Sequence, residues 1–147
     1  MIKTSILSFQ ELSSETLYEI LALRSAVFIV EQQCFYQDLD YKDQNAQHLL
    51  VHENNKLIGY GRILPYNDEN SMSFGRLVTA LSHRRNGLGK QMMGLILNFL
   101  KNHHPKQTIK ITAQHYLQNF YANYGFVVQG APFDMDGLPH VLMVKQP

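Results

Sequence analysis

Hydrophobic and polar positions change period several times along the chain, and each change predicts an element of secondary structure. Alternation over residues 4–9 predicts a first strand, and Ser13 or Ser14 is a suitable N-cap for the helix that follows. Hydrophobic residues then recur at helical spacing up to Phe28, as in an amphipathic helix. Arg24 falls on the same stripe. A charge on a buried face needs a partner, so we expect Arg24 to pair with an acid of the segment that follows.

The segment 31–45 loses this period and is rich in polar residues. We interpret it as a structured surface loop of negative charge, because its acids outnumber its single lysine, Lys42. The acidic residues are Glu31, Asp38, Asp40 and Asp43. Cys34 lies in the same segment, and we expect it to be a small buried hydrophobic side chain rather than a nucleophile.

Three strands in an antiparallel meander are predicted next. Residues 47–53 and 56–66 have strand character, and Asn54-Asn55 between them tolerates the positive φ of a tight hairpin turn. Residues 71–79 form the third strand. Helical spacing then predicts a helix over 88–100 that opens in a glycine-rich turn and ends before Pro105.

The last part of the chain alternates strands with a short helix. Residues 108–114 predict a strand, and residues 117–124 a short helix with Gly125 at its C′ position. Two strands, 126–129 and 138–144, close the chain around the turn Asp136-Gly137. This order predicts an α/β fold with a mixed sheet and helices on its faces, in one domain spanning residues 1–147.

Composition excludes several functional classes. The chain has 147 residues, 45% hydrophobic and 17% charged, with a net charge of +1, so it lacks the basic field of a general nucleic-acid binder. No apolar run approaches the roughly 18 residues of a membrane span. A single cysteine excludes an internal disulfide and fits a cytoplasmic location. The histidines are not spaced as metal ligands, so we expect no metal, and we leave open whether the protein forms a homodimer.

The most informative segment is Arg84-Arg85-Asn86-Gly87-Leu88-Gly89-Lys90, between a predicted strand and a predicted helix. Glycines let the backbone approach a ligand closely, and the first helical N–H groups have no partner within the helix. A pyrophosphate would satisfy these donors. The alternative without a function is a basic turn exposed to solvent. The spacing fits neither a Walker A loop nor the dinucleotide fingerprint, since position 92 is Met.

Arg84-x-x-Gly87-x-Gly89 resembles the acyl-CoA signature of the GNAT N-acetyltransferase superfamily. Tyr121-x-x-x-Gly125-Phe126, one strand and one helix later, resembles a second motif of that superfamily. Further stretches resemble its ElaA-type branch, namely Arg24 to Asp40, Gly75-Arg76, Ala113-Gln114 with Leu117 to Tyr121, and Asp136 to His140. Phe35 departs from the pattern, which has proline after the cysteine.

The resemblance implies that two central parallel strands, ending near Thr79 and Gln114, splay apart and hold acetyl-CoA in the gap. Its pantetheine would pair with the open backbone of the first strand, and its pyrophosphate would lie on the glycine-rich turn. The residues expected to bind acetyl-CoA are Leu77, Val78, Thr79, Arg84, Arg85, Asn86, Gly87, Leu88, Gly89, Lys90 and Gln114.

Three residues are candidates for the chemistry. Tyr121 is the candidate general acid for the leaving thiolate, because a phenol of pKa about 10 can protonate a thiolate whose conjugate acid has a pKa of about 8.5. The alternative is a core aromatic. Glu31 and His140 are candidates for the general base. Partial burial would raise the pKa of Glu31 into a useful range; the alternatives are a solvated carboxylate and a structural histidine.

The predicted function is therefore transfer of an acetyl group from acetyl-CoA to the primary amine of a small molecule or peptide, by direct attack in a ternary complex. The acidic segment 31–45 favours a cationic amine. One alternative is a non-catalytic acyl-CoA-binding module, although such a module is expected to lose Tyr121 or the glycines. The other is an enzyme similar to acyl-homoserine-lactone synthases, which have a longer C-terminal region.

Overall fold

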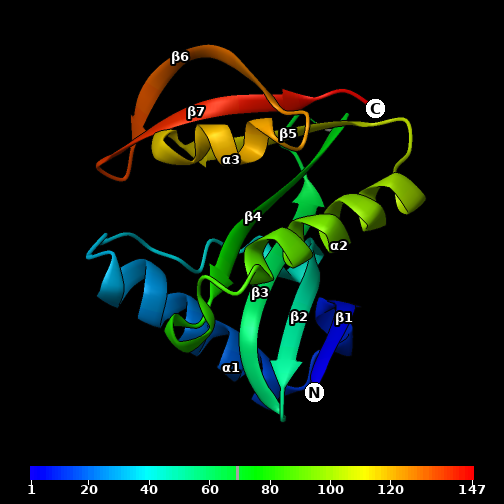
Figure 1. Ribbon diagram of the computed structural model, residues 1–147, viewed down its shortest axis with the longest axis vertical. Coiled ribbons are helices and arrows are strands. Elements are labelled where there is room, and N and C mark those ends of the chain that lie inside the picture. The colour runs from blue at the N-terminus through cyan, green and yellow to red at the C-terminus, as the bar shows by residue number, and fades with distance from the viewer. Residues whose placement is uncertain (69) are drawn as a thin grey trace.

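The computed structural model describes residues 1–68 and 70–147, which form a mixed sheet of seven strands in the order β1-β2-β3-β4-β5-β7-β6 (Figure 1). The strands are β1 (Ile2–Ser8), β2 (Gln47–Glu53), β3 (Lys56–Pro65), β4 (Ser71–Thr79), β5 (Thr108–Gln114), β6 (Val127–Met135) and β7 (Leu138–Lys145). The helices are α1 (Ser14–Arg24), α2 (Leu88–His103) and α3 (Gln118–Ala122). The predicted α/β class and order of elements are confirmed.

Local signals account for where the first elements begin and turn. The Ser13 hydroxyl accepts a hydrogen bond from the Thr16 amide at 3.0 Å, which caps α1 as expected. Beyond Arg24 the helix widens into a π-helical segment, Ser25–Glu31. Asn54 and Asn55 both have positive φ, at 51° and 67°, and form the predicted turn between β2 and β3.

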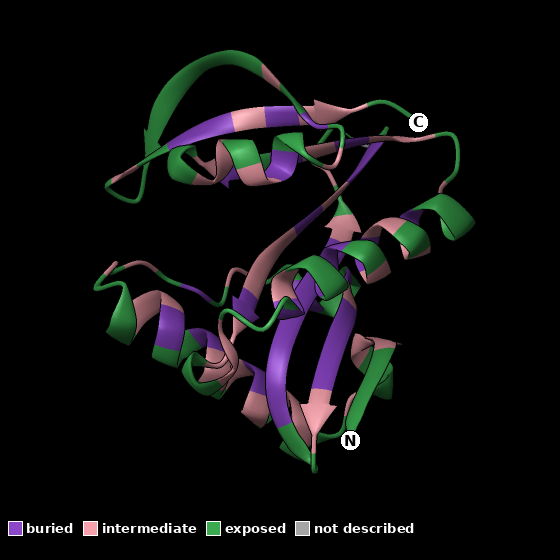
Figure 2. Ribbon diagram, in the orientation of Figure 1, coloured by how far each residue is buried: buried purple, intermediate pink, exposed green. Residues whose placement is uncertain are grey.

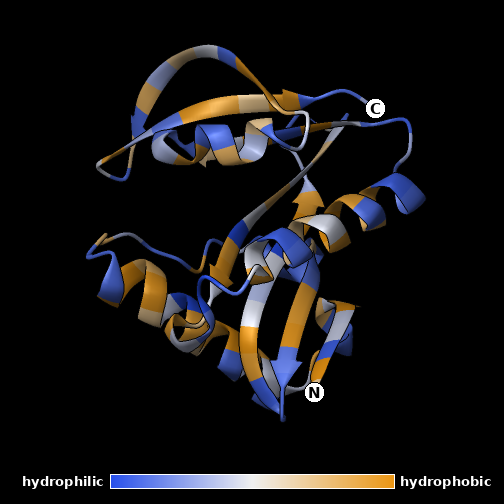
Figure 3. Cartoon of the chain, viewed as in Figure 1, coloured by the Kyte–Doolittle hydropathy of each residue, from blue (hydrophilic) through white to orange (hydrophobic). Residues whose placement is uncertain are grey.

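The two longer helices cover opposite faces of the sheet. Leu49 and Val51 of β2 pack into the cluster that contains Met92 and Ile96 of α2. Leu50, which lies between them and points the other way, packs with Ile20 of α1. Figure 2 shows that β2 and β3 are buried along most of their length, and Figure 3 shows hydrophobic positions of α2 separated by hydrophilic ones.

The centre of the sheet opens where its two parallel strands meet. β4 and β5 pair only at Ser71 with Thr108 and at Met72 with Ile109. Beyond Met72 the strands diverge, while β4 stays paired with β3 and β5 stays paired with β7. The predicted splay is therefore confirmed. It leaves a stretch of β4 with one backbone edge that no strand of residues 1–68 and 70–147 covers.

The end of the chain differs from the sequence prediction. β6 reaches Met135 rather than ending at Gln129, with a register shift between Gln129 and Phe133. Gly130 has φ +85° inside this irregular stretch. β6 is an exposed edge strand (Figure 2). Because few of its residues are buried, hydrophobic and polar residues do not alternate along it, and its length follows from its pairing with β7.

None of the helices formed by residues 1–68 and 70–147 combines the length and hydrophobicity that a membrane crossing needs.

Candidate active site

The glycine turn (residues 84–90) ends on the first turn of α2. Gly87 is the N-cap with φ +75°, and Arg85 also has positive φ, at 67°. A Cβ built on Gly87 or Gly89 would meet no atom within 4 Å, so both glycines face open space. Because the amides of a helix N-terminus lack partners, this open backbone fits the pyrophosphate of acetyl-CoA.

Arg84 has a partner that the sequence did not indicate. Its Nη1 and Nη2 donate to the two carboxylate oxygens of Glu31 at 2.6 and 2.8 Å. The hydrogen bond from Arg84 lowers the pKa of Glu31, and the side chain is 41% exposed. The expected rise of this pKa by burial is therefore wrong. Arg85 and Lys90 are exposed beside it.

The uncovered edge of β4 includes the residues expected to pair with pantetheine. Val78 is buried in the cluster on the α1 face, whereas Leu77 and Thr79 are half-buried. Gln114 ends β5 across the splay and pairs with His140 of β7. The structure thus places the expected cofactor residues along one side of the gap and Gln114 on the other.

Tyr121 is buried in α3, with 9% of its surface exposed. Its ring lies against Phe74, Phe120 and Phe126, with centroids between 5.2 and 6.2 Å away. Burial raises the pKa of Tyr121 to about 12. Tyr121 is therefore a packed aromatic residue, and its phenol stays protonated at neutral pH. The packing alternative and the acid role are compatible.

His140 lies on β7 and lines a cavity in the gap. Its Nδ1 is 2.8 Å from the carbonyl oxygen of Leu138. A carbonyl only accepts, so Nδ1 carries the proton and Nε2 of the neutral ring has a lone pair available. The ring stacks on Phe133, with centroids 6.4 Å apart. This is the tautomer that a base acting through Nε2 requires.

His140 and Tyr121 lie on opposite faces of the sheet. Val141 and Met143 belong to the core cluster that also contains Tyr121 and the α2 residues. Alternation along β7 therefore turns His140 toward the other face. The candidate acid and base thus border the gap from its two sides.

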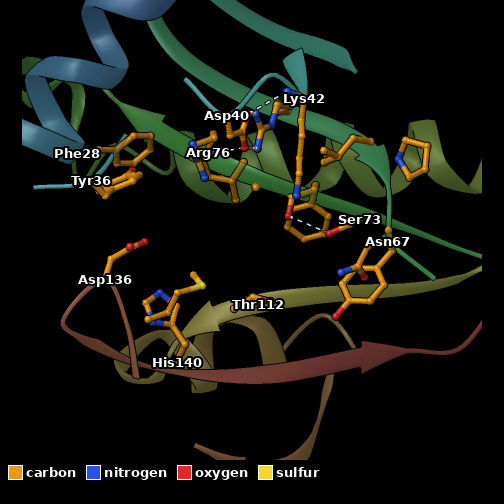
Figure 4. Close-up of a pocket in the computed structure, with 18 of the residues that line it drawn as sticks. Phe28, Tyr36, Asp40, Lys42, Asn67, Ser73, Arg76, Thr112, Asp136 and His140 are labelled. Atoms are coloured by element: carbon orange, nitrogen blue, oxygen red, sulfur yellow. Dashed lines mark hydrogen bonds and ion pairs between the residues drawn. The ribbon is translucent and has the colours of Figure 1, made fainter. Parts of the chain in front are cut away.

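The cavity beside His140, here called the central cavity, has a volume of about 460 Å³. One wall comes from β3, β4 and the segment before β2, and Figure 4 places Asp40, Lys42 and Arg76 there. The facing wall comes from β5 and the β6–β7 hairpin and carries Thr112, Asp136 and His140 (Figure 4). The cavity is of a size that holds a small molecule.

A closed ring of ion pairs forms part of the first wall and extends behind it. Three arginines alternate with three aspartates, and each arginine contacts two aspartates at distances between 2.7 and 3.4 Å. In order around the ring, the residues are Arg24, Asp38, Arg76, Asp40, Arg62 and Asp43. The expected pairing of Arg24 with an acid of the following segment is confirmed through Asp38.

The ion-pair ring changes the interpretation of segment 31–45. Most of the segment is exposed, as expected of a surface loop, but Asp38 and Asp43 are buried and three arginine charges balance the three aspartates. The expected negative charge of the loop is therefore wrong. Burial by itself raises the pKa of Asp43, but hydrogen bonds and charge from Arg24 and Arg62 outweigh it and lower that pKa. Arg62 was missed, although a charge inside an otherwise hydrophobic strand was a usable signal.

Cys34 and Tyr36 connect segment 31–45 to the rest of the cavity. The Cys34 thiol donates to the carbonyl oxygen of Asp136 at 3.1 Å, across the gap to the β6–β7 turn. Cys34 is therefore half-buried and hydrogen-bonded, not a buried hydrophobic side chain as expected. The ring of Tyr36 lies under the Arg76 guanidinium, 5.5 Å from its centroid.

Comparisons with known proteins agree with this architecture. The family model of the acetyltransferase (GNAT) domain matches residues 10–147. Protein ElaA of Escherichia coli is 37% identical over 149 residues, which cover 99% of this chain and 97% of that protein. The crystal structure of Escherichia coli ElaA superposes with a TM-score of 0.92, covering 99% of this chain and 100% of that one.

Two further structures extend the comparison. An acyl-CoA N-acyltransferase from Pseudomonas aeruginosa is 32% identical, with a TM-score of 0.94 and 99% coverage of both chains. A CoA-dependent acyl-homoserine lactone synthase has a TM-score of 0.81 over 99% of this chain and 83% of its own, at 16% identity. That last likeness concerns the fold alone.

Proposed function

Because the chain belongs to the GNAT acetyltransferase family and is an acyltransferase of the ElaA-type branch, we propose that it acetylates a primary amine with acetyl-CoA in a ternary complex. The observation that carries the proposal is the end of β4–β5 pairing at Met72. The splay leaves backbone donors and acceptors of β4 uncovered, directly before a helix N-terminus that faces open space. An amide-rich pantetheine joined to a pyrophosphate matches both features.

The chain's own residues hold acetyl-CoA along this line. Leu77, Val78 and Thr79 offer backbone N–H and C=O groups to the pantetheine, and residues 84–90 offer amides and positive charge to the phosphates. Gln114 borders the gap from β5. Acetyl-CoA supplies the activated acetyl thioester when it is bound. Bound in this way, its acyl end would lie in the gap, which Tyr121 borders from one face of the sheet and His140 from the other.

His140 is the proposed general base. Nε2 has a lone pair in the tautomer that the Leu138 carbonyl selects, and the ring lines the central cavity. His140 accepts a proton from the amine nitrogen as that nitrogen bonds to the acetyl carbon. Glu31 is a weaker candidate, because Arg84 lowers its pKa and holds both of its oxygens.

Tyr121 is the proposed general acid on the opposite face. As the carbon–sulfur bond breaks, its hydroxyl donates to the departing sulfur. Burial raises the pKa of Tyr121 to about 12, so full proton transfer to a thiolate is uphill. Tyr121 therefore acts mainly as a hydrogen-bond donor that stabilises the negative charge on sulfur.

The two alternative functions have less support. A non-catalytic acyl-CoA-binding module would use the glycine turn but has no use for the Tyr121 hydroxyl, which this chain has. The likeness to an acyl-homoserine lactone synthase is at 16% identity, which concerns the fold and does not indicate a shared substrate. We accordingly treat residues 1–147 as one N-acetyltransferase domain.

The proposal is tested by incubating the protein with acetyl-CoA and a pool of amines, amino acids and peptides, followed by mass spectrometry. We expect at least one amine to gain an acetyl group in proportion to the free CoA released. Release of CoA without any acetylated product, or binding of acetyl-CoA without release, would contradict it. The Tyr121→Phe protein is the matched control, because it retains the ring and loses the hydroxyl.

A further inference from the structure

The charges of the central cavity are divided between its two walls. Lys42 and Arg76 lie on the wall of β4 and the segment before β2, and Figure 4 shows the Lys42 side chain extending into the space between the walls. Asp136 and His140 lie on the facing wall (Figure 4). The cavity is therefore positive on one side, and on the other it carries the Asp136 carboxylate and the His140 imidazole.

The aspartates of the positive wall are already neutralised. Asp40 binds Arg62 through both of its oxygens, each at 2.8 Å, and also contacts Arg76. Asp38 and Asp43 are buried behind it and each contacts two arginines. Among the described residues of this wall, no carboxylate is left unpaired to attract a cation, so segment 31–45 does not provide the attraction for a cationic amine that its acidic residues predicted.

Arg76 and Lys42 both have side-chain hydrogen-bond donors that the ion-pair ring does not use. Arg76 uses Nε and Nη2 in the ion-pair ring, and among the described residues no partner contacts its Nη1. Lys42 forms no ion pair with any described residue, and its backbone amide donates to Asp40 at 3.1 Å, which positions it next to the ring. A guanidinium and an ammonium on the same wall of a cavity favour an anionic group, and a carboxylate is the commonest such group on a small amine.

We propose that the acceptor is a small amine that also carries a carboxylate, with the carboxylate bound by Lys42 and Arg76 and the amine directed to Asp136 and His140. This inference rests on the proposed function and names its substrate class. The amine arrives as an ammonium, so Asp136 attracts it to this wall. It loses one proton to solvent to become the neutral nucleophile, and His140 accepts the second proton as the carbon–nitrogen bond forms. The cavity volume of about 460 Å³ suits an acceptor the size of an amino acid.

The test compares amines that differ only by a carboxylate. The pairs are lysine with cadaverine, phenylalanine with 2-phenylethylamine, and 4-aminobutyrate with propylamine, each assayed by CoA release at saturating acetyl-CoA. We expect kcat/KM to be at least about tenfold higher for the better carboxylate-bearing members. Lys42→Gln should remove most of this preference without changing KM for acetyl-CoA, and Lys42→Glu should invert it. Lys56→Gln, at the exposed start of β3, is the matched control and should change neither value.

A second measurement separates this inference from the proposed function. Calorimetry of the N-acetyl forms of the same compounds measures binding without turnover. If the N-acetyl compounds that carry a carboxylate bind to the wild type but not to Lys42→Gln, the inference is supported even where no amine is acetylated. Acetylation that favours the amines without a carboxylate overturns the inference and leaves the acetyltransferase function standing. The inference is also overturned if both Lys42 variants keep the preference for acceptors with a carboxylate. It is overturned as well if the carboxylate-bearing compounds are neither acetylated nor bound.

Discussion

Arg84 binds both carboxylate oxygens of Glu31, and this pair joins the glycine turn to the end of the π-helical segment. The contact links the two regions that border the gap near the first turn of α2. It also withdraws Glu31 from proton transfer, because a carboxylate whose pKa is lowered by its partner is a poor base.

Glu31→Gln should therefore keep most of the activity. We expect kcat to stay within about threefold of the wild-type value, since the amide can still contact Arg84 while losing all basicity. Steady-state kinetics with one acceptor measures this. A fall of about a hundredfold or more, together with loss of the acidic limb of the pH profile, would restore Glu31 as the base.

His140→Gln should lower kcat by about 10² to 10⁴, because Nε2 is the atom that accepts the amine proton and a glutamine amide has no basic nitrogen to replace it. Steady-state kinetics with one acceptor provides the measurement. An unchanged kcat in the variant would make His140 a structural histidine. His52→Gln, in β2, serves as control.

Tyr121→Phe should lower kcat by a similar order, about 10² to 10⁴, while KM for acetyl-CoA changes little. The substitution keeps the ring contacts with Phe74 and Phe126. With a pKa of about 12, Tyr121 itself contributes no alkaline limb below about pH 11. Tyr124→Phe on the neighbouring turn should leave kcat unchanged. Full activity in Tyr121→Phe would return Tyr121 to a packing role.

Gly89→Val should weaken acetyl-CoA binding by at least about tenfold, or 1.4 kcal/mol, because the side chain would fill the space beside the first turn of α2. Gly94→Val is a matched control, since it places the same side chain on an exposed glycine of the same helix. Calorimetry measures both, and wild-type affinity should also fall as salt rises. Unchanged affinity in Gly89→Val would remove the glycine turn from the cofactor site.

Asp43→Asn should lower the free energy of unfolding by about 3 to 5 kcal/mol, because it leaves Arg24 and Arg62 buried with one partner fewer. The pKa of Asp43 is lowered in the fold, so its stabilisation is complete above its ordinary pKa and is lost as pH falls through the lowered value. Urea titrations from pH 7 to 3 should show this loss in the wild type and less of it in the variant.

Asp68→Asn, which removes the exposed pair with Lys110 at 2.7 Å, is the control for the ion-pair ring. It should cost no more than about 1 kcal/mol. An equal cost for both substitutions would show that burial of the ring contributes nothing.

Local interactions let the sequence determine the order of elements and several of their ends. Ser13 caps α1, and Asn54-Asn55 forms the hairpin turn. Both depend on residues within four positions in the chain, so both could be predicted from the local sequence. The glycine turn was readable for the same reason. Periodicity predicts which residues of a helix or strand are buried, but not which face of the sheet they pack against. It therefore assigned Tyr121 to a helix and His140 to a strand without predicting that they lie on opposite faces.

The tertiary structure alone decided the partners of the charged side chains. Arg24 meets Asp43, Arg62 meets Asp40 and Arg84 meets Glu31 across 19, 22 and 53 residues of sequence, because the sheet order brings these segments together. The same order sets the faces from which Tyr121 and His140, the candidate acid and base, border the gap. Coulomb attraction acts between whichever charges the packed fold makes neighbours, so residues that form a negative loop in sequence become a neutral ring in space.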